Sequence, residues 1–124
     1  MTVRQILVLI ADDDEVFREG LQVVLSDYYD SVLTTGNGSE AVDIVASLLP
    51  DVILIDPEGR GLEAARQIKA RWSQTLVILL SVFDCYLDAA LEIGADGYLL
   101  KGCHTEELLA VIHRLTSLAE TVGM

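Results

Sequence analysis

Cysteine, basic residues and long apolar runs are all scarce in this sequence, and each scarcity argues against a class of protein. The two cysteines, Cys85 and Cys103, form neither a C-x-x-C pair nor a disulfide framework, so we expect both thiols to be reduced. Only 8 basic residues stand against 20 acidic ones, which gives a net charge of −12. Such a surface repels polyphosphate backbones and anionic membranes, so direct nucleic-acid contact is not expected.

The apolar runs are too short to cross a membrane. The longest, Leu76 to Leu80 and Ile6 to Ala11, fall far below the roughly 20 residues that span a bilayer. The segment Met1 to Gln5 lacks the features of a secretion signal, namely a basic region, an apolar stretch and a small-residue cleavage site. We therefore expect a cytoplasmic protein with no membrane segment.

The sequence does contain a regular alternation of two kinds of segment. Five near-continuous runs rich in Val, Ile and Leu have the composition of strands covered on both faces: Gln5–Ala11, Ser31–Thr35, Asp51–Asp56, Thr75–Ser81 and Gly97–Lys101. Helical periodicity follows each run, at Glu15–Leu25, Glu40–Leu49, Leu62–Trp72, Cys85–Ile93 and 106 to about 119. No repeat or linker interrupts this alternation.

The alternation predicts a single α/β domain over residues 1–124. Right-handed crossovers would give a doubly wound (βα)5 fold, a flavodoxin-like three-layer sandwich with parallel strand order 2-1-3-4-5. Boundary signals agree with this count. Asn37 stands three residues before Glu40, the spacing of a capping box, and Pro50 falls just after the second helix. Gly94 suits the C-terminal cap of the fourth helix.

The last two predicted helices carry wide apolar surfaces. In the fourth, we expect Leu87, Ala90 and Leu91 to face the core, which leaves a second stripe of Tyr86, Ala89 and Ile93. That second stripe is either a partner surface or a contact with another element of the domain. In the fifth, the expected core face is Leu108, Val111, Ile112, Leu115 and Leu118. A homodimer through helix four, strand five and helix five is a hypothesis.

Polar residues stand where four of the predicted strands end. The acidic run Asp12, Asp13 and Asp14 follows the first strand, Asp56 closes the third, Ser81 the fourth and Lys101 the fifth. In parallel α/β sheets, the ligand site lies beyond these carboxyl ends. Each residue alone is ordinary, because loops at strand ends are often acidic and a lone Lys is usually a solvated charge. Together they predict one site.

The chemistry of this predicted site follows from its charges. Strands one and three would be neighbours, so Asp12 or Asp13 should repel Asp56 by roughly 1 to 4 kcal/mol unless a cation intervenes. Mg²⁺ prefers such oxygen ligands and is often bound by one or two carboxylates with phosphate oxygens. In this interpretation Asp56 attacks phosphorus as a nucleophile, Lys101 offsets charge on the phosphoryl oxygens and Ser81 donates its hydroxyl to them.

Three stretches resemble the receiver domains of two-component response regulators, with similarity over essentially the whole chain. They are Ile6 to Asp14 with Arg18 to Leu21, Pro50 to Asp56, and Gly94 to Lys101. The resemblance implies that Asp56 accepts a phosphoryl group from a histidine kinase or phosphotransfer protein, and that Asp13 binds Mg²⁺ directly while Asp12 helps through water. It also implies that Ser81 and Tyr98 form a switch pair, with Lys101 contacting phosphate. The sequences Arg18 to Leu21 and Gly97 to Lys101 are most similar to the subgroup fused to helix-turn-helix DNA-binding domains. We therefore expect the signal to pass to a downstream protein or to a fused output domain.

The loop after Asp56 departs from the family pattern. It reads Pro57-Glu58-Gly59-Arg60-Gly61, lacks the family's Met-Pro and is shorter. Glu58 inherits the position whose backbone carbonyl contacts the metal and whose N–H contacts the phosphoryl group. Its carboxylate is expected either to be an additional metal ligand or to pair with Lys101, and in the second case it would compete with phosphate.

Two other classes of function compete with a phosphorylated switch that is not itself an enzyme. One is a pseudo-receiver that docks proteins without reading phosphate, an alternative that the short loop keeps open. The other is an enzyme or carrier of the same topology. A flavodoxin-like FMN protein needs a Ser/Thr/Gly-rich loop where this chain has Asp12 to Glu15. An aspartate-dependent phosphatase usually carries its nucleophile after the first strand and has a cap domain.

Overall fold

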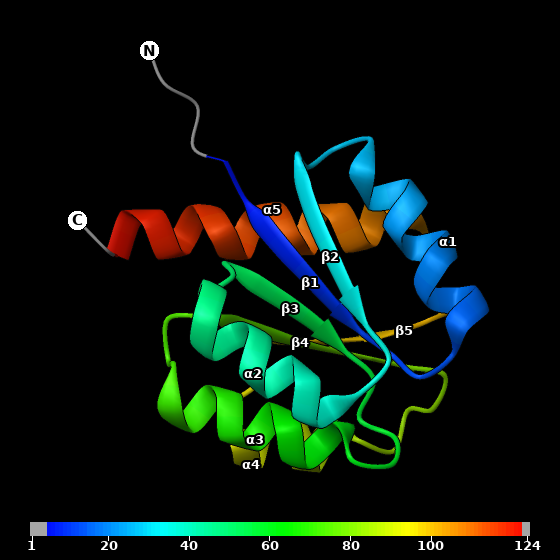
Figure 1. The fold of residues 1–124 in the computed structure, drawn as a ribbon, viewed down its shortest axis with the longest axis vertical. Coiled ribbons are helices and arrows are strands. Elements are labelled where there is room, and N and C mark those ends of the chain that lie inside the picture. The colour runs from blue at the N-terminus through cyan, green and yellow to red at the C-terminus, as the bar shows by residue number, and fades with distance from the viewer. Residues whose placement is uncertain (1–4, 123–124) are drawn as a thin grey trace.

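The computed structural model describes residues 5–122, in which five strands and five helices alternate (Figure 1). The strands are β1 (Leu7–Ala11), β2 (Ser31–Thr35), β3 (Val52–Ile55), β4 (Leu76–Ser81) and β5 (Gly97–Leu100). The helices are α1 (Glu15–Ser26), α2 (Gly38–Leu48), α3 (Gly61–Arg71), α4 (Leu87–Ile93) and α5 (Thr105–Val122). Every segment expected from the sequence corresponds to an observed element, so the predicted alternation is confirmed.

The strands form one parallel sheet in the order β2-β1-β3-β4-β5, as predicted. The register fixes where the site lies. Ala11 is the partner of Ile55, and Ile55 is also the partner of Leu79. The carboxyl ends of β1, β3 and β4 are therefore side by side, and the residues that follow them share one edge of the sheet.

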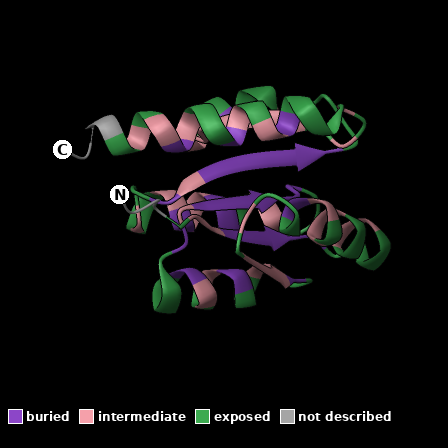
Figure 2. Ribbon diagram, turned by 90° about the horizontal axis from the view of Figure 1, so that it is seen from above, coloured by how far each residue is buried: buried purple, intermediate pink, exposed green. Residues whose placement is uncertain are grey.

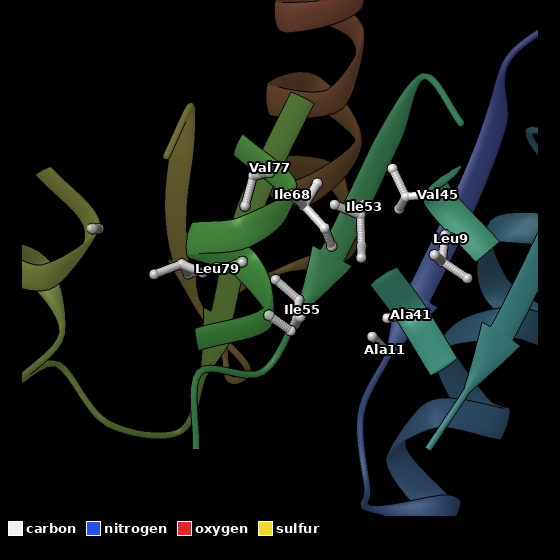
Figure 3. Close-up of a cluster of buried hydrophobic side chains, with 12 residues drawn as sticks. Leu9, Ala11, Ala41, Val45, Ile53, Ile55, Ile68, Val77 and Leu79 are labelled. Atoms are coloured by element: carbon white, nitrogen blue, oxygen red, sulfur yellow. The ribbon is translucent and has the colours of Figure 1, made fainter. Parts of the chain in front are cut away.

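Two hydrophobic cores cover the two faces of the sheet, because alternate residues of each strand point to opposite sides. On one face α2, α3 and α4 pack on the strands, and Ala41 and Val45 of α2 contact the core residues of β1 (Figure 3). On the other face α1 and α5 pack through residues such as Leu25, Leu108 and Ile112. The predicted three-layer sandwich is confirmed, with buried strands between helices whose outer faces are exposed (Figure 2).

Side chains at the helix ends explain where several elements begin and stop. Asp14 caps α1 by accepting a hydrogen bond from the Phe17 amide at 3.1 Å, so this member of the acidic run belongs to the helix. Asn37 caps α2 by accepting from the amides of Ser39 and Glu40. Gly94 ends α4 with φ of 77°, in the left-handed region that favours glycine.

Helix α4 presents a different face to the core from the one expected. Ala90 is buried as predicted, but Leu87 is 55% exposed and Leu91 is 71% exposed, whereas Ile93 packs against the core. The prediction was wrong because the helix has two apolar stripes, and the stripe of Tyr86, Ala89 and Ile93 is the half-buried one. In α5 the assignment of Leu118 to the core was also wrong, since its side chain is 55% exposed near the end of the helix.

Within residues 5–122, no helix is both long and apolar enough to cross a membrane. Cys85 and Cys103 are free, as expected. The cytoplasmic location stays a prediction.

Candidate functional site

Three carboxylates meet at the carboxyl ends of β1 and β3. Asp12, Asp13 and Asp56 each offer an oxygen atom within 4.8 Å of the other two. Asp12 and Asp56 are buried, and Asp13 is exposed. The backbone fixes their spacing, because the Asp56 amide donates to the Ala11 carbonyl at 3.0 Å and continues the pairing of the two strands. The predicted acidic cluster is therefore present.

Lys101 supplies the cation of this cluster. Its Nζ lies 2.7 Å from Oδ2 of Asp12 and 2.7 Å from Oδ2 of Asp56, and its side chain is 9% exposed. Burial acts to lower the pKa of Lys101, but hydrogen bonds to the two carboxylates outweigh burial and raise that pKa. The ammonium also lies 4.4 Å from the centroid of the Phe17 ring. Lys101 therefore remains charged and links the ends of β1 and β3.

Glu58 contacts Asp56 through its backbone and not through its side chain. Its amide donates to Oδ1 of Asp56 at 2.8 Å, and its carbonyl accepts from the Gly61 amide at 3.1 Å. Its carboxylate accepts a 2.6 Å hydrogen bond from the Tyr86 hydroxyl. The side chain therefore joins neither Lys101 nor the three clustered carboxylates in this structure, because Tyr86 holds it toward the start of α4.

The two expected switch residues lie on the neighbouring strands β4 and β5. Ser81 is fully buried, and its Oγ accepts from the Phe83 amide at 3.0 Å. The Tyr98 hydroxyl donates to the Phe83 carbonyl and accepts from the Tyr86 amide at 3.1 Å. Both side chains thus contact the loop between β4 and α4. The sequence placed Tyr86 in the second stripe of the fourth helix, but its contact with Glu58 was not predicted, because no spacing rule pairs the two residues.

A cleft of about 390 Å³ opens over the cluster. Its walls include the three aspartates, Glu58 and Arg60, together with the loop that precedes α2. The cleft is large enough for a hydrated metal ion and a phosphoryl group side by side, since a water molecule occupies about 30 Å³ of liquid. The site can therefore admit a charged ligand from solvent.

A family model described as "Response regulator receiver domain" matches residues 8–113. The transcriptional regulatory protein YdfI of Bacillus subtilis is 41% identical over 107 residues, which cover 82% of this chain and 50% of that protein. The chain belongs to the response regulator receiver family.

Solved receiver structures agree with this assignment. A LuxR-family DNA-binding response regulator from Staphylococcus aureus has a TM-score of 0.82 at 26% identity, covering 90% of this chain and 98% of that one. The BeF3-activated N-terminal receiver domain of Klebsiella pneumoniae RstA has a TM-score of 0.79 at 26% identity, covering 88% and 97% of the two chains. This receiver chain spans about half the length of the curated relatives that it matches.

The donor set of this receiver fits Mg²⁺. Receiver domains bind Mg²⁺ at an acidic cluster of this kind. Mg²⁺ is commonly held by one or two carboxylates with water completing its shell, so three carboxylate oxygens within 4.8 Å of one another could share one ion directly or through water. All three donors are carboxylates, and Asp13 is open to solvent. Asp12, Asp13 and Asp56 are therefore the residues that would hold the ion.

Proposed function

We propose that this receiver is a phosphorylation switch in which Asp56 accepts a phosphoryl group. The observation that carries the proposal is the grouping of Asp56 with Asp12, Asp13 and Lys101 in one open cleft. A carboxylate nucleophile, a metal site and a buried cation are the components that phosphoryl transfer requires. In the proposed role the chain is a substrate of phosphorylation and a signal carrier, and not an enzyme acting on a separate substrate.

Each residue has a specific task in the proposed reaction. One oxygen of Asp56 forms a bond to phosphorus while the bond from phosphorus to the donor breaks, and the donor leaves with its electron pair. Lys101, already 2.7 Å from Oδ2 of Asp56, offsets charge on the phosphoryl oxygens. The Glu58 amide and the Ser81 hydroxyl supply hydrogen bonds to those oxygens. Bound Mg²⁺ would supply further positive charge to the same oxygens.

The proposed partners follow from the family. We expect the donor to be a sensor histidine kinase or a phosphotransfer protein, and the reader to be a downstream protein or a fused output domain. YdfI is named as a transcriptional regulatory protein, and the structure from Staphylococcus aureus as DNA-binding. A net charge of −12 makes direct DNA contact by this domain unfavourable. Any binding of DNA would therefore belong to an output domain.

The shortened loop after Asp56 supports a second candidate, a pseudo-receiver that docks proteins without phosphate. Lys101 and the Glu58 amide already occupy both oxygens of Asp56, so the metal-free site is neutralised in part by the protein itself. If the site kept this arrangement, the domain would hold one conformation for docking without being phosphorylated.

Intact mass after incubation with acetyl phosphate and Mg²⁺ distinguishes the two candidates. We expect the wild type to gain one phosphoryl group, released acetate being the other product. Asp56→Asn should gain none, because it removes the nucleophile. Asp84→Asn is the matched control, since it makes the same chemical change at an exposed position in the loop after β4. A folded wild type that stays unmodified would overturn phosphorylation and favour the docking module.

A further inference from the structure

A hydrogen bond between Glu58 and Tyr86 joins two loops that are far apart in the sequence. The Tyr86 hydroxyl donates to Oε2 of Glu58 at 2.6 Å. This short bond to a charged acceptor is among the stronger kinds of side-chain hydrogen bond. It connects the loop after β3, which follows Asp56, to the residue that immediately precedes α4.

Both ends of this bond reach residues of the proposed switch. At one end, the amide of Glu58 donates to Oδ1 of Asp56 at 2.8 Å. At the other, the amide of Tyr86 donates to the Tyr98 hydroxyl at 3.1 Å, and that hydroxyl contacts the carbonyl of Phe83. A continuous path of hydrogen-bonded residues therefore runs from the proposed phosphoacceptor to Tyr98.

Helix α4 is short and has little buried surface. It is seven residues long, its N-cap Tyr86 makes no side-chain cap hydrogen bond, and Ala90 is its one buried residue. Helices this short are marginal unless tertiary contacts hold them. An element with so few buried contacts belongs to the low-stability part of a fold, where local opening requires little free energy.

We propose that the hydrogen bond between Glu58 and Tyr86 is a resting-state latch that holds the start of α4 against the loop after Asp56, with Tyr86 as its positioning residue. The inference rests on the proposed phosphorylation of Asp56, which would release the latch. A phosphoryl group recruits the Glu58 amide, and its negative charge repels the nearby Glu58 carboxylate. The start of α4 then loses one of its supports, and its exposed Leu87 and Leu91 can move with it.

The latch itself is tested in metal-free protein, without any phosphoryl chemistry. The hydrogen bond to Glu58 raises the pKa of Tyr86 to about 12, from an ordinary value of 10.0. The donor hydroxyl therefore stays protonated at neutral pH, and the bond is lost only as the pH rises through about 12. In a tyrosine absorbance titration, Glu58→Gln should move this ionisation toward 10, because a neutral amide is a weaker acceptor.

Amide hydrogen exchange gives a second readout of the same contact. Tyr86→Phe removes the donor and should speed exchange of the residue 86 amide by about twofold to tenfold, the range for loss of one ordinary hydrogen bond. Tyr28→Phe is the matched control, because Tyr28 is 62% exposed on the loop after α1. Unchanged exchange in Tyr86→Phe, or an unmoved ionisation in Glu58→Gln, would overturn the latch.

Beryllofluoride with Mg²⁺ tests the coupling to the proposed switch. If the latch forms only in the resting state, its loss favours the liganded state, so Tyr86→Phe should bind beryllofluoride about twofold to tenfold more tightly in calorimetry. This variant keeps the Glu58 charge, which separates release of the latch from removal of a repelling carboxylate. Equal or weaker binding would overturn the coupling. Absence of Asp56 phosphorylation in the acetyl phosphate experiment would instead reject the proposed function. The tyrosine titration and the amide exchange in metal-free protein would still show whether the latch exists.

Discussion

At the scale of single residues, Lys101 is a buried cation that pairs with two buried carboxylates. Its ammonium lies between Asp12 and Asp56, whose side chains are 3% and 9% exposed. Removing one member of a buried ion pair leaves the remaining charge without compensation, which typically costs 3 to 5 kcal/mol. In metal-free protein we therefore expect Lys101→Met to lower the free energy of unfolding by about 3 kcal/mol, measured by urea denaturation.

Repeating the urea denaturation of Lys101→Met with Mg²⁺ shows whether the loss of stability arises at the acidic cluster. Mg²⁺ should recover part of the loss in Lys101→Met, because the ion can replace the missing positive charge. Lys69→Met is the matched control, since Lys69 pairs with Asp96 at 2.8 Å and also donates to the carbonyls of Ser73 and Thr75. We expect that variant to lie about 1 to 2 kcal/mol below wild type both with and without Mg²⁺, because the ion stabilises both proteins equally. If Mg²⁺ left the difference between Lys101→Met and wild type unchanged, the assignment of the metal site would be contradicted.

At the scale of elements, the short loop brings the start of α3 close to the phosphoacceptor strand. Gly61 is the first residue of α3, and a Cβ atom added there would lie 1.7 Å from the carbonyl oxygen of Asp56. Because that neighbour is backbone, the strand end itself would have to move. We expect Gly61→Ala to lower the free energy of unfolding by about 2 kcal/mol or more in urea denaturation.

Glycine 20 provides the matched substitution for this prediction. Gly20 lies inside α1 with no atom within 4 Å of an added Cβ. Gly20→Ala should therefore stabilise the protein by about 0.5 to 1 kcal/mol, because alanine loses less backbone entropy in a helix. A Gly61→Ala variant as stable as the wild type would show that α3 can move freely relative to Asp56.

The elements and the acidic cluster were predictable from the sequence, whereas the side-chain network around them was not. Alternating apolar runs determined the sheet, and the sheet in turn brought Asp12 and Asp56 together at its carboxyl edge. The contact of Glu58 with Tyr86 depends on the rotamers of two polar side chains 28 positions apart, which no periodicity encodes. The face of α4 was mispredicted for a related reason, since both of its stripes are apolar.

At the scale of the whole molecule, acidic residues are in large excess, and three of them meet where the protein would bind a cation. The net charge of −12 makes the folded chain repel itself. The three carboxylates within 4.8 Å of one another add a local electrostatic repulsion, which the single charge of Lys101 offsets only in part. A ligand that binds only the folded state stabilises it by mass action. Mg²⁺ at the cluster should therefore raise the stability of the entire domain.

Thermal and urea denaturation with and without Mg²⁺ measure this linkage directly. At a free Mg²⁺ concentration ten times the dissociation constant, the free energy of unfolding should rise by about 1.4 kcal/mol. Asp13→Asn should stabilise the metal-free protein by about 1 kcal/mol, since it removes one repelling charge, and should lose most of the Mg²⁺ effect. Asp30→Asn makes the same change on the exposed loop before β2 and should keep the full Mg²⁺ effect, because Asp30 lies at the opposite end of the strands. If Mg²⁺ stabilised wild type and Asp13→Asn equally, the ion would be acting by general screening of the acidic surface and not at the cluster.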